Sequence, residues 1–118
     1  MSPISKSAVL AVLVSLVVSV AALASSSATA VAVTAGKPSE FRFTLSKRTI
    51  LKGTGIFKVT NKGALPHNFK IAGKKTKLIA KGKSATLTVA LPKAGKYAFL
   101  CTVPGHAAGG MKGVLTVR

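Results

Sequence analysis

The chain has 118 residues, of which 18 are Lys or Arg and only one, Glu40, is acidic, so its formal net charge is +17. A single carboxylate excludes the two-carboxylate chemistry of glycoside hydrolases and the dyad of aspartic proteases. A single cysteine likewise excludes an internal disulfide, which leaves a bound metal as a means of stabilising a small domain.

Residues 1–30 are predicted to be a signal peptide. Lys6 supplies the positive charge, residues 8–24 form an apolar run, and a tail of small residues ends in an Ala-Thr-Ala cleavage signature at 28–30. Cleavage after this signature leaves residues 31–118 as one domain, exported to the secreted, periplasmic or cell-envelope space. The alternative is retention by an uncleaved membrane anchor, although the apolar run falls just short of the roughly 18 to 20 residues that span a bilayer.

From Val31 onward the sequence has the pattern of an all-β domain. Strands are expected at residues 40–46, 49–51, 56–60, 68–72, 85–91, 96–101 and 112–117, separated by turns at 52–55, 61–63 and 92–95 and by a basic connection at 73–83. The residues expected to face the core are Phe41, Phe43, Leu45, Phe57, Val59, Leu78, Ile79, Leu87, Val89, Leu91, Val114 and Leu115. Short strands at this spacing predict an antiparallel sandwich or barrel with Greek-key crossings.

One loop near the C-terminus gathers residues that can bind a soft metal. Cys101, His106 and Met111 are each separated by four residues and offer a thiolate, an imidazole and a thioether, a ligand set that suits copper. The second histidine, His67, lies far upstream, so it joins this loop only if the fold brings it back. Each residue alone has a structural explanation, such as a core methionine or a small buried cysteine. Together, in this order, they favour copper.

The motifs ALPHNF, CTVPGH and GGM resemble those of the cupredoxins, the small blue copper proteins that include plastocyanin, azurin and auracyanin. The resemblance covers residues 31–118 and implies a Greek-key β-sandwich of the cupredoxin type. It also implies a mononuclear type 1 copper site, with His67, Cys101 and His106 as strong trigonal ligands and Met111 as the weak axial one.

The resemblance assigns roles to neighbouring residues as well. The side chain of Asn68 is expected to bond to Thr102, the residue after the cysteine, and so to hold the metal loop. Small and apolar residues around the two histidines are expected to form a face through which an exposed edge of His106 passes electrons.

The resulting hypothesis is an exported type 1 (blue) copper protein that cycles between Cu(I) and Cu(II), carries one electron at a time and is not an enzyme. The alternative is storage or delivery of Cu(I) by the same ligands. A copper oxidase or nitrite reductase needs further histidines, and a Cys-His hydrolase needs an orienting group and an oxyanion site that no motif supplies. A metal-free basic domain that acts in adhesion is the least specific alternative.

The charge determines which partners are expected. A field of this sign favours encounter with anionic partners, so we expect a monomer that meets a redox protein with an acidic docking surface. Contact with an anionic cell envelope explains the charge equally well. Nucleic acid is not expected, because no aromatic or helical reading motif accompanies the basic residues.

Overall fold

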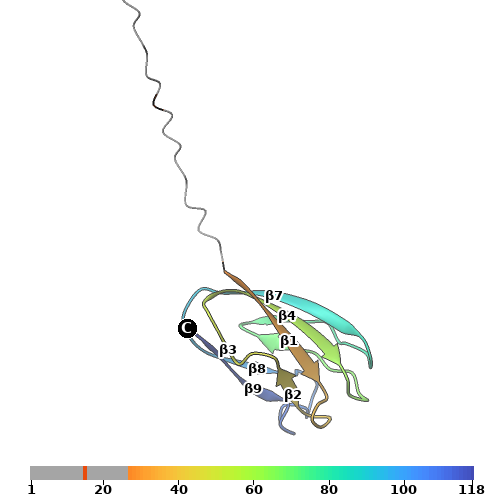
Figure 1. Cartoon of the computed structure of the whole chain (residues 1–118). Helices are drawn as coiled ribbons and strands as arrows, with labels where there is room; N and C mark the ends of the chain where they lie inside the picture. Colours follow the sequence, from red (N-terminus) through yellow and green to blue (C-terminus); the bar gives the residue numbers. More distant parts are fainter. Residues whose placement is uncertain (1–14, 16–26) are drawn as a thin grey trace, which may run out of the picture.

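A computed structural model of the protein describes Ser15 and residues 27–118. In this part of the chain nine strands, and no helix, form two facing sheets (Figure 1). The strands are β1 (Ala28–Ala35), β2 (Phe43–Leu45), β3 (Thr49–Ile50), β4 (Gly53–Asn61), β5 (Lys70–Ile71), β6 (Lys74–Lys75), β7 (Ser84–Leu91), β8 (Gly95–Leu100) and β9 (Lys112–Val117). The all-β sandwich is therefore confirmed. The described residues form no helix that is long and apolar enough to cross a membrane.

The first sheet has the strand order β2-β1-β4-β7 and the second the order β3-β9-β8-β5-β6. The expectation of purely antiparallel sheets is wrong for two pairs, since β1 runs parallel to β4 and β3 runs parallel to β9. Alternating apolar and polar residues mark a strand with one buried face but carry no information on its direction. The direction follows from the connections, because the chain passes through β2 and β3 between β1 and β4 and can return in the same sense.

The predicted signal peptide lies almost entirely outside the described residues. Its C-terminal end does not, because residues 28–30 open β1 and pair with residues 54–56 of β4. The boundary placed after Ala30 therefore falls inside a strand, and cleavage there would remove the start of β1. That boundary stays a prediction.

Four phenylalanines fill the core between the sheets, with Phe69 at their centre. Its ring centroid lies 5.3 Å from that of Phe43, 5.4 Å from that of Phe57 and 5.5 Å from that of Phe99. Full burial of one such ring stabilises a fold by about 1.5–3 kcal/mol. Since Phe69 follows His67 by two residues, this packing also fixes the segment that carries the first histidine.

Three residues predicted to face the core are exposed instead. Phe41 precedes β2, which begins only at Phe43, and is 36% exposed. Leu78 and Val114 are 59% and 46% exposed. At both places the adjacent residue, Ile79 or Leu115, takes the inward position, because neighbouring side chains of extended backbone point to opposite sides.

Candidate metal centre

The donor atoms of three predicted ligands converge at one end of the sandwich. His67 forms an isolated bridge with Ile79 ahead of β5, Cys101 directly follows β8, and His106 lies in the loop that leads to β9. The Nδ1 atoms of the two histidines are 3.1 Å apart. The Cys101 Sγ atom lies 3.6 Å from His106 Nδ1 and 4.0 Å from His67 Nδ1. The fold therefore returns the upstream histidine to the loop, as predicted.

This triangle has the size that a metal ion needs. A trigonal centre with bonds of about 2.0 Å to nitrogen and about 2.3 Å to sulfur places its donors about 3.5 Å (N to N) and about 3.7 Å (N to S) apart. The observed separations of 3.1, 3.6 and 4.0 Å scatter around these values. An ion can therefore enter the triangle with shifts of a few tenths of an ångström.

The site is shielded from water. His67 is 0% exposed, Cys101 1% and His106 8%, and the side chain of Met111 is fully buried. Met111 closes the loop through its backbone, since its N–H donates to the His106 carbonyl and its own carbonyl accepts from the Cys101 N–H, each at 3.0 Å. The fourth predicted ligand is thus held beside Cys101 and His106 in the fold.

The loop between Cys101 and Met111 folds through turns that need glycine. The N–H of Gly109 donates to the Gly105 carbonyl at 3.0 Å, and the N–H of His106 donates to Val103 at 3.1 Å. Gly105 has a φ of 84° and Gly110 a φ of 114°, in the left-handed region that favours glycine. These turns allow eleven residues of chain, 101–111, to bring three candidate ligands to one end of the sandwich.

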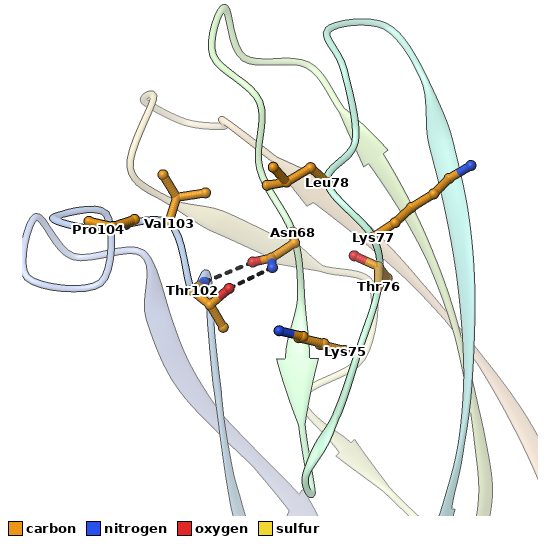
Figure 2. Close-up of a pocket in the computed structure, with 8 residues that line it drawn as sticks. All are labelled: Asn68, Lys75, Thr76, Lys77, Leu78, Thr102, Val103 and Pro104. Atoms are coloured by element: carbon orange, nitrogen blue, oxygen red, sulfur yellow. Dashed lines mark hydrogen bonds between the residues drawn. The ribbon is translucent and has the colours of Figure 1, made fainter.

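Asn68 links the two segments that carry the ligands, as predicted (Figure 2). Its Nδ2 donates to Thr102 Oγ1 at 2.6 Å, and its Oδ1 accepts from the Thr102 N–H at 2.8 Å. Since Asn68 follows His67 and Thr102 follows Cys101, this pair of bonds sets the spacing between two ligand backbones.

Asn61 was predicted only as part of a turn. It is fully buried, and its side chain forms hydrogen bonds with the backbone around His67. Its Nδ2 donates to the carbonyls of Leu65 and Ile79, each at 2.8 Å, and its Oδ1 accepts from the Gly63 N–H at 2.9 Å. One side chain therefore satisfies two backbone groups of the segment before His67 and ties that segment to Ile79. An Asn in a turn signals local bonding, but not bonds across the fold.

Glu40 is the second residue that the sequence did not assign to the site. Its carboxylate accepts hydrogen bonds from the N–H groups of Ala64 and Leu65, each at 2.9 Å, and from His67 Nε2 at 2.8 Å. The bond from Ala64, followed by that from Leu65, lowers the pKa of this carboxyl from 4.5 to about 2. Glu40 is therefore ionised at neutral pH. The one available signal was that the chain has no other acid.

The Glu40 carboxylate also determines which nitrogen of His67 faces the site. An ionised carboxylate can only accept, so His67 Nε2 carries a hydrogen, and in the neutral ring Nδ1 is then the nitrogen with the free lone pair. That lone pair is directed toward Cys101 and His106, where a metal ligand needs it. The neutral imidazole is thus held in its metal-binding tautomer.

His106 is more enclosed than expected. The ring of Phe41 lies 4.9 Å from the His106 ring, centroid to centroid, at an angle of 56°. Only 8% of His106 is exposed, so the predicted open edge is largely covered. Burial, and then the nearby His67, lowers the pKa of His106. The histidine is therefore biased toward the neutral form that binds metals.

A family model described as a Cupredoxin-like domain matches residues 8–117. The chain belongs to this cupredoxin-like family. The match spans all nine strands and both ligand segments.

Relatives with similar sequences match this cupredoxin over a short stretch. Auracyanin-B of Chloroflexus aurantiacus is 45% identical over 42 residues, which are 36% of this chain and 18% of that protein. The copper-resistant cuproprotein CopI of Pseudomonas aeruginosa is 49% identical over 41 residues, which are 35% of this chain and 23% of CopI. These matches therefore span less than a quarter of either relative.

A solved structure is similar over most of the domain. Reduced auracyanin from Roseiflexus castenholzii is 27% identical, with a TM-score of 0.55, over 77% of this chain and 96% of the other. The fold of this cupredoxin is therefore similar to that of auracyanin.

Copper is the cofactor of this cupredoxin. A thiolate and two imidazoles in a trigonal arrangement form the donor set of blue-copper sites. The buried triangle of His67, Cys101 and His106 supplies that set among the described residues. The hard oxygen ligands that calcium or magnesium prefers are missing from this cluster.

A cleft of about 360 Å³ lies beside the metal loop (Figure 2). We call it the Thr102 cleft. It is lined by Asn68, Lys75, Thr76, Lys77, Leu78, Thr102, Val103 and Pro104. Leu78 and Val103 lie on one side of the Asn68–Thr102 pair, and Lys75 lies on the other with its amine directed toward Thr102. The cleft thus combines apolar surface with a cation that faces Thr102, the residue after Cys101.

Proposed function

We propose that this cupredoxin is an exported carrier of single electrons, with copper held by His67, Cys101 and His106 and with Met111 as the weak axial ligand. The observation that carries the proposal is the preformed, buried triangle of two Nδ1 atoms and one Sγ atom. Bound copper supplies the Cu(I)/Cu(II) couple. A His₂Cys set with a long thioether bond suits both oxidation states, so little rearrangement accompanies transfer.

The protein residues prepare the site before the metal arrives. His67 is already in the required tautomer, so in the metal-free protein the short contact between the two Nδ1 atoms requires His106 Nδ1 to donate. Binding of a metal at His106 Nδ1 therefore requires the ring hydrogen to move to Nε2, and binding at Cys101 displaces the thiol proton. We expect copper affinity to rise with pH for this reason.

Storage or delivery of Cu(I) is the second candidate function. It is favoured by the similarity to CopI, whose name describes a copper-resistant cuproprotein. Burial argues for the carrier, because a donor set that is at most 8% exposed exchanges its metal slowly. The same predicted signal peptide would serve either function outside the cytoplasm.

The proposed partner is a redox protein that presents an acidic surface to the Thr102 cleft. The cleft adjoins the residue that follows Cys101, so docking there brings a second redox centre close to the thiolate. Lys75 at its rim is exposed, and the only carboxylate side chain of the chain, Glu40, is bonded to residues 64, 65 and 67 instead. An acidic partner therefore meets lysine charge that no side chain of this protein neutralises.

The copper assignment is tested by adding Cu(II) to the reduced, metal-free protein and recording the visible spectrum. We expect an intense blue thiolate-to-copper band that is absent in the Cys101→Ser variant. Met111→Leu should keep the band and raise the reduction potential, since the axial ligand tunes that potential. A colourless wild-type protein with a thiol that still reacts would contradict the proposal.

The carrier and delivery functions are separated by metal retention. The loaded protein is cycled between oxidised and reduced states in the presence of a competing Cu(I) chelator. A carrier retains its copper through many cycles, whereas a delivery protein transfers it to the chelator within the first reduced interval. Loss of copper in that interval would exclude the electron carrier and favour Cu(I) storage or delivery.

The docking site is tested by reaction with an acidic redox protein at increasing ionic strength. We expect the second-order rate to fall with salt and to fall further in Lys75→Gln. Lys58→Gln, an exposed lysine on the other sheet, is the control with the same change in charge. Equal rates for the two variants would exclude the Thr102 cleft as the docking site.

A further inference from the structure

Residues 40–42 contact three parts of the copper site from outside the ligand loop. Glu40 binds the ring of His67, and Phe41 lies against the ring of His106. Arg42 lies over Gly110, where a Cβ would come within 3.1 Å of its guanidinium group. These consecutive residues, the "40–42 clamp", therefore touch the surroundings of both histidines and the residue before Met111.

The backbone around Glu40 and His67 leaves room for their contact and holds the carboxylate in place. Gly63 leaves the space for it, because a Cβ there would lie 2.7 Å from Glu40 Oε1 and 2.9 Å from His67 Nε2. Two backbone N–H groups hold the carboxylate in place independently of the histidine. The carboxylate is thus a fixed acceptor, and the imidazole must orient toward it.

We propose that Glu40 is a positioning residue of the copper site that fixes the His67 ring through its Nε2–H and favours Cu(II) over Cu(I). The proposal rests on the assignment of His67 as a copper ligand. A carboxylate that accepts from the far nitrogen of a metal-bound imidazole makes the near nitrogen more basic. A more basic ligand stabilises the more highly charged ion more strongly.

Glu40 is the one acidic side chain in a strongly basic protein, so it is the one carboxylate side chain whose negative charge can stabilise Cu(II). Eighteen Lys and Arg residues disfavour the extra positive charge of the oxidised site, and Glu40 is the single side chain that opposes them. It lies one imidazole ring away from the donor triangle, with a side chain that is only 29% exposed. Partial burial reduces screening by water, so its effect exceeds that of a surface charge.

The test compares Glu40→Gln with wild type and with Thr88→Lys. Glutamine keeps an acceptor of the same shape and removes the charge, while Thr88→Lys makes the same change in net charge on an exposed position of β7. Cu(II) and Cu(I) affinities are measured by competition, together with the reduction potential and the electron paramagnetic resonance spectrum of the oxidised protein.

We expect Glu40→Gln to weaken Cu(II) binding by about 10- to 100-fold, the usual effect of mutating the hydrogen-bond partner of a metal ligand, because the charge that makes His67 more basic is lost. Cu(I) binding should change much less. A tenfold change in the ratio of the two affinities raises the potential by about 59 mV. Thr88→Lys should leave the ratio and the copper hyperfine splitting near wild-type values. A ratio in Glu40→Gln equal to that of Thr88→Lys would overturn the proposal.

A measurement on the wild-type protein covers the case in which Glu40→Gln fails to fold. Nitrogen-15 NMR of the Cu(I) form should show a His67 Nε2–H that exchanges slowly with water, because a fixed carboxylate holds it. Rapid exchange of that hydrogen would also overturn the proposal. Both outcomes are distinct from failure of the copper assignment itself, in which the wild-type protein would show no blue band.

Discussion

The Asn68–Thr102 pair gives a quantitative test of how the two ligand segments are joined. Asn68→Ala removes both hydrogen bonds, of 2.6 and 2.8 Å, whereas Thr102→Val removes only the one to the hydroxyl. A net contribution of about 0.5–1.5 kcal/mol per bond predicts that Asn68→Ala loses about 1–3 kcal/mol of unfolding free energy. Thr102→Val should lose about half as much. A loss of about 2 kcal/mol lowers the Tm of a domain of this size by about 8–16 °C.

The assay is urea unfolding of the copper-free variants, followed by circular dichroism, with unchanged m-values as a check on two-state behaviour. Thr86→Val is the matched control, since Thr86 is an exposed threonine on β7, in the other sheet. The double variant Asn68→Ala/Thr102→Val should be no less stable than Asn68→Ala alone, because the bond to the hydroxyl is already lost. Additive losses, or a loss in Asn68→Ala below about 0.5 kcal/mol, would refute the link between the segments.

Three further predictions follow from the packing and the charges. Gly113→Ala places a Cβ against the buried ring of Phe99 and should cost about 1–3 kcal/mol in urea unfolding, with no effect expected from the exposed neighbour Lys112→Ala. Because the folded-state pKa of Glu40 is about 2, below the usual 4.5, its contribution is complete above about pH 4.5 and is lost as the pH falls through 2. The stability advantage of copper-free wild type over Glu40→Gln should therefore shrink steadily from pH 4.5 to pH 2, and an undiminished advantage at pH 2 would contradict the assignment. Copper at 100 times its dissociation constant should stabilise the wild type by about 2.7 kcal/mol but leave Cys101→Ser unchanged, as differential scanning calorimetry can check.

Much of the site could be predicted because the ability to bind a metal depends on residue type and on spacing along the chain. Cysteine, histidine and methionine are the residues that bind a soft metal, and five-residue steps within one loop limit how far apart Cys101, His106 and Met111 can lie. Local alternation likewise predicted the inward faces of β4 and β7, where Phe57, Val59 and Leu91 are fully buried. Period-two burial is a property of each strand by itself.

The surroundings of the metal depended on contacts that no local pattern encodes. Alternation predicted Phe41 to be a strand residue facing the core, but the strand begins at Phe43, and Phe41 covers His106 instead. Glu40 had no interpretable local signal, because its partners lie 24 to 27 residues further along the chain. The bond from Asn61 to the Ile79 carbonyl, 18 residues away, had no local signal for the same reason.

By itself, then, the sequence determined the all-β class and the four candidate ligands, since each rests on residue chemistry or on the period of a strand. The Asn68–Thr102 pair was implied by the resemblance to the cupredoxins. Only the tertiary structure decided the parallel pairing of β1 with β4, the approach of His67 to Cys101 and the covering of the site by the 40–42 clamp. These depend on which distant segments the two sheets place side by side. That choice minimises the free energy of the whole core, to which every strand contributes.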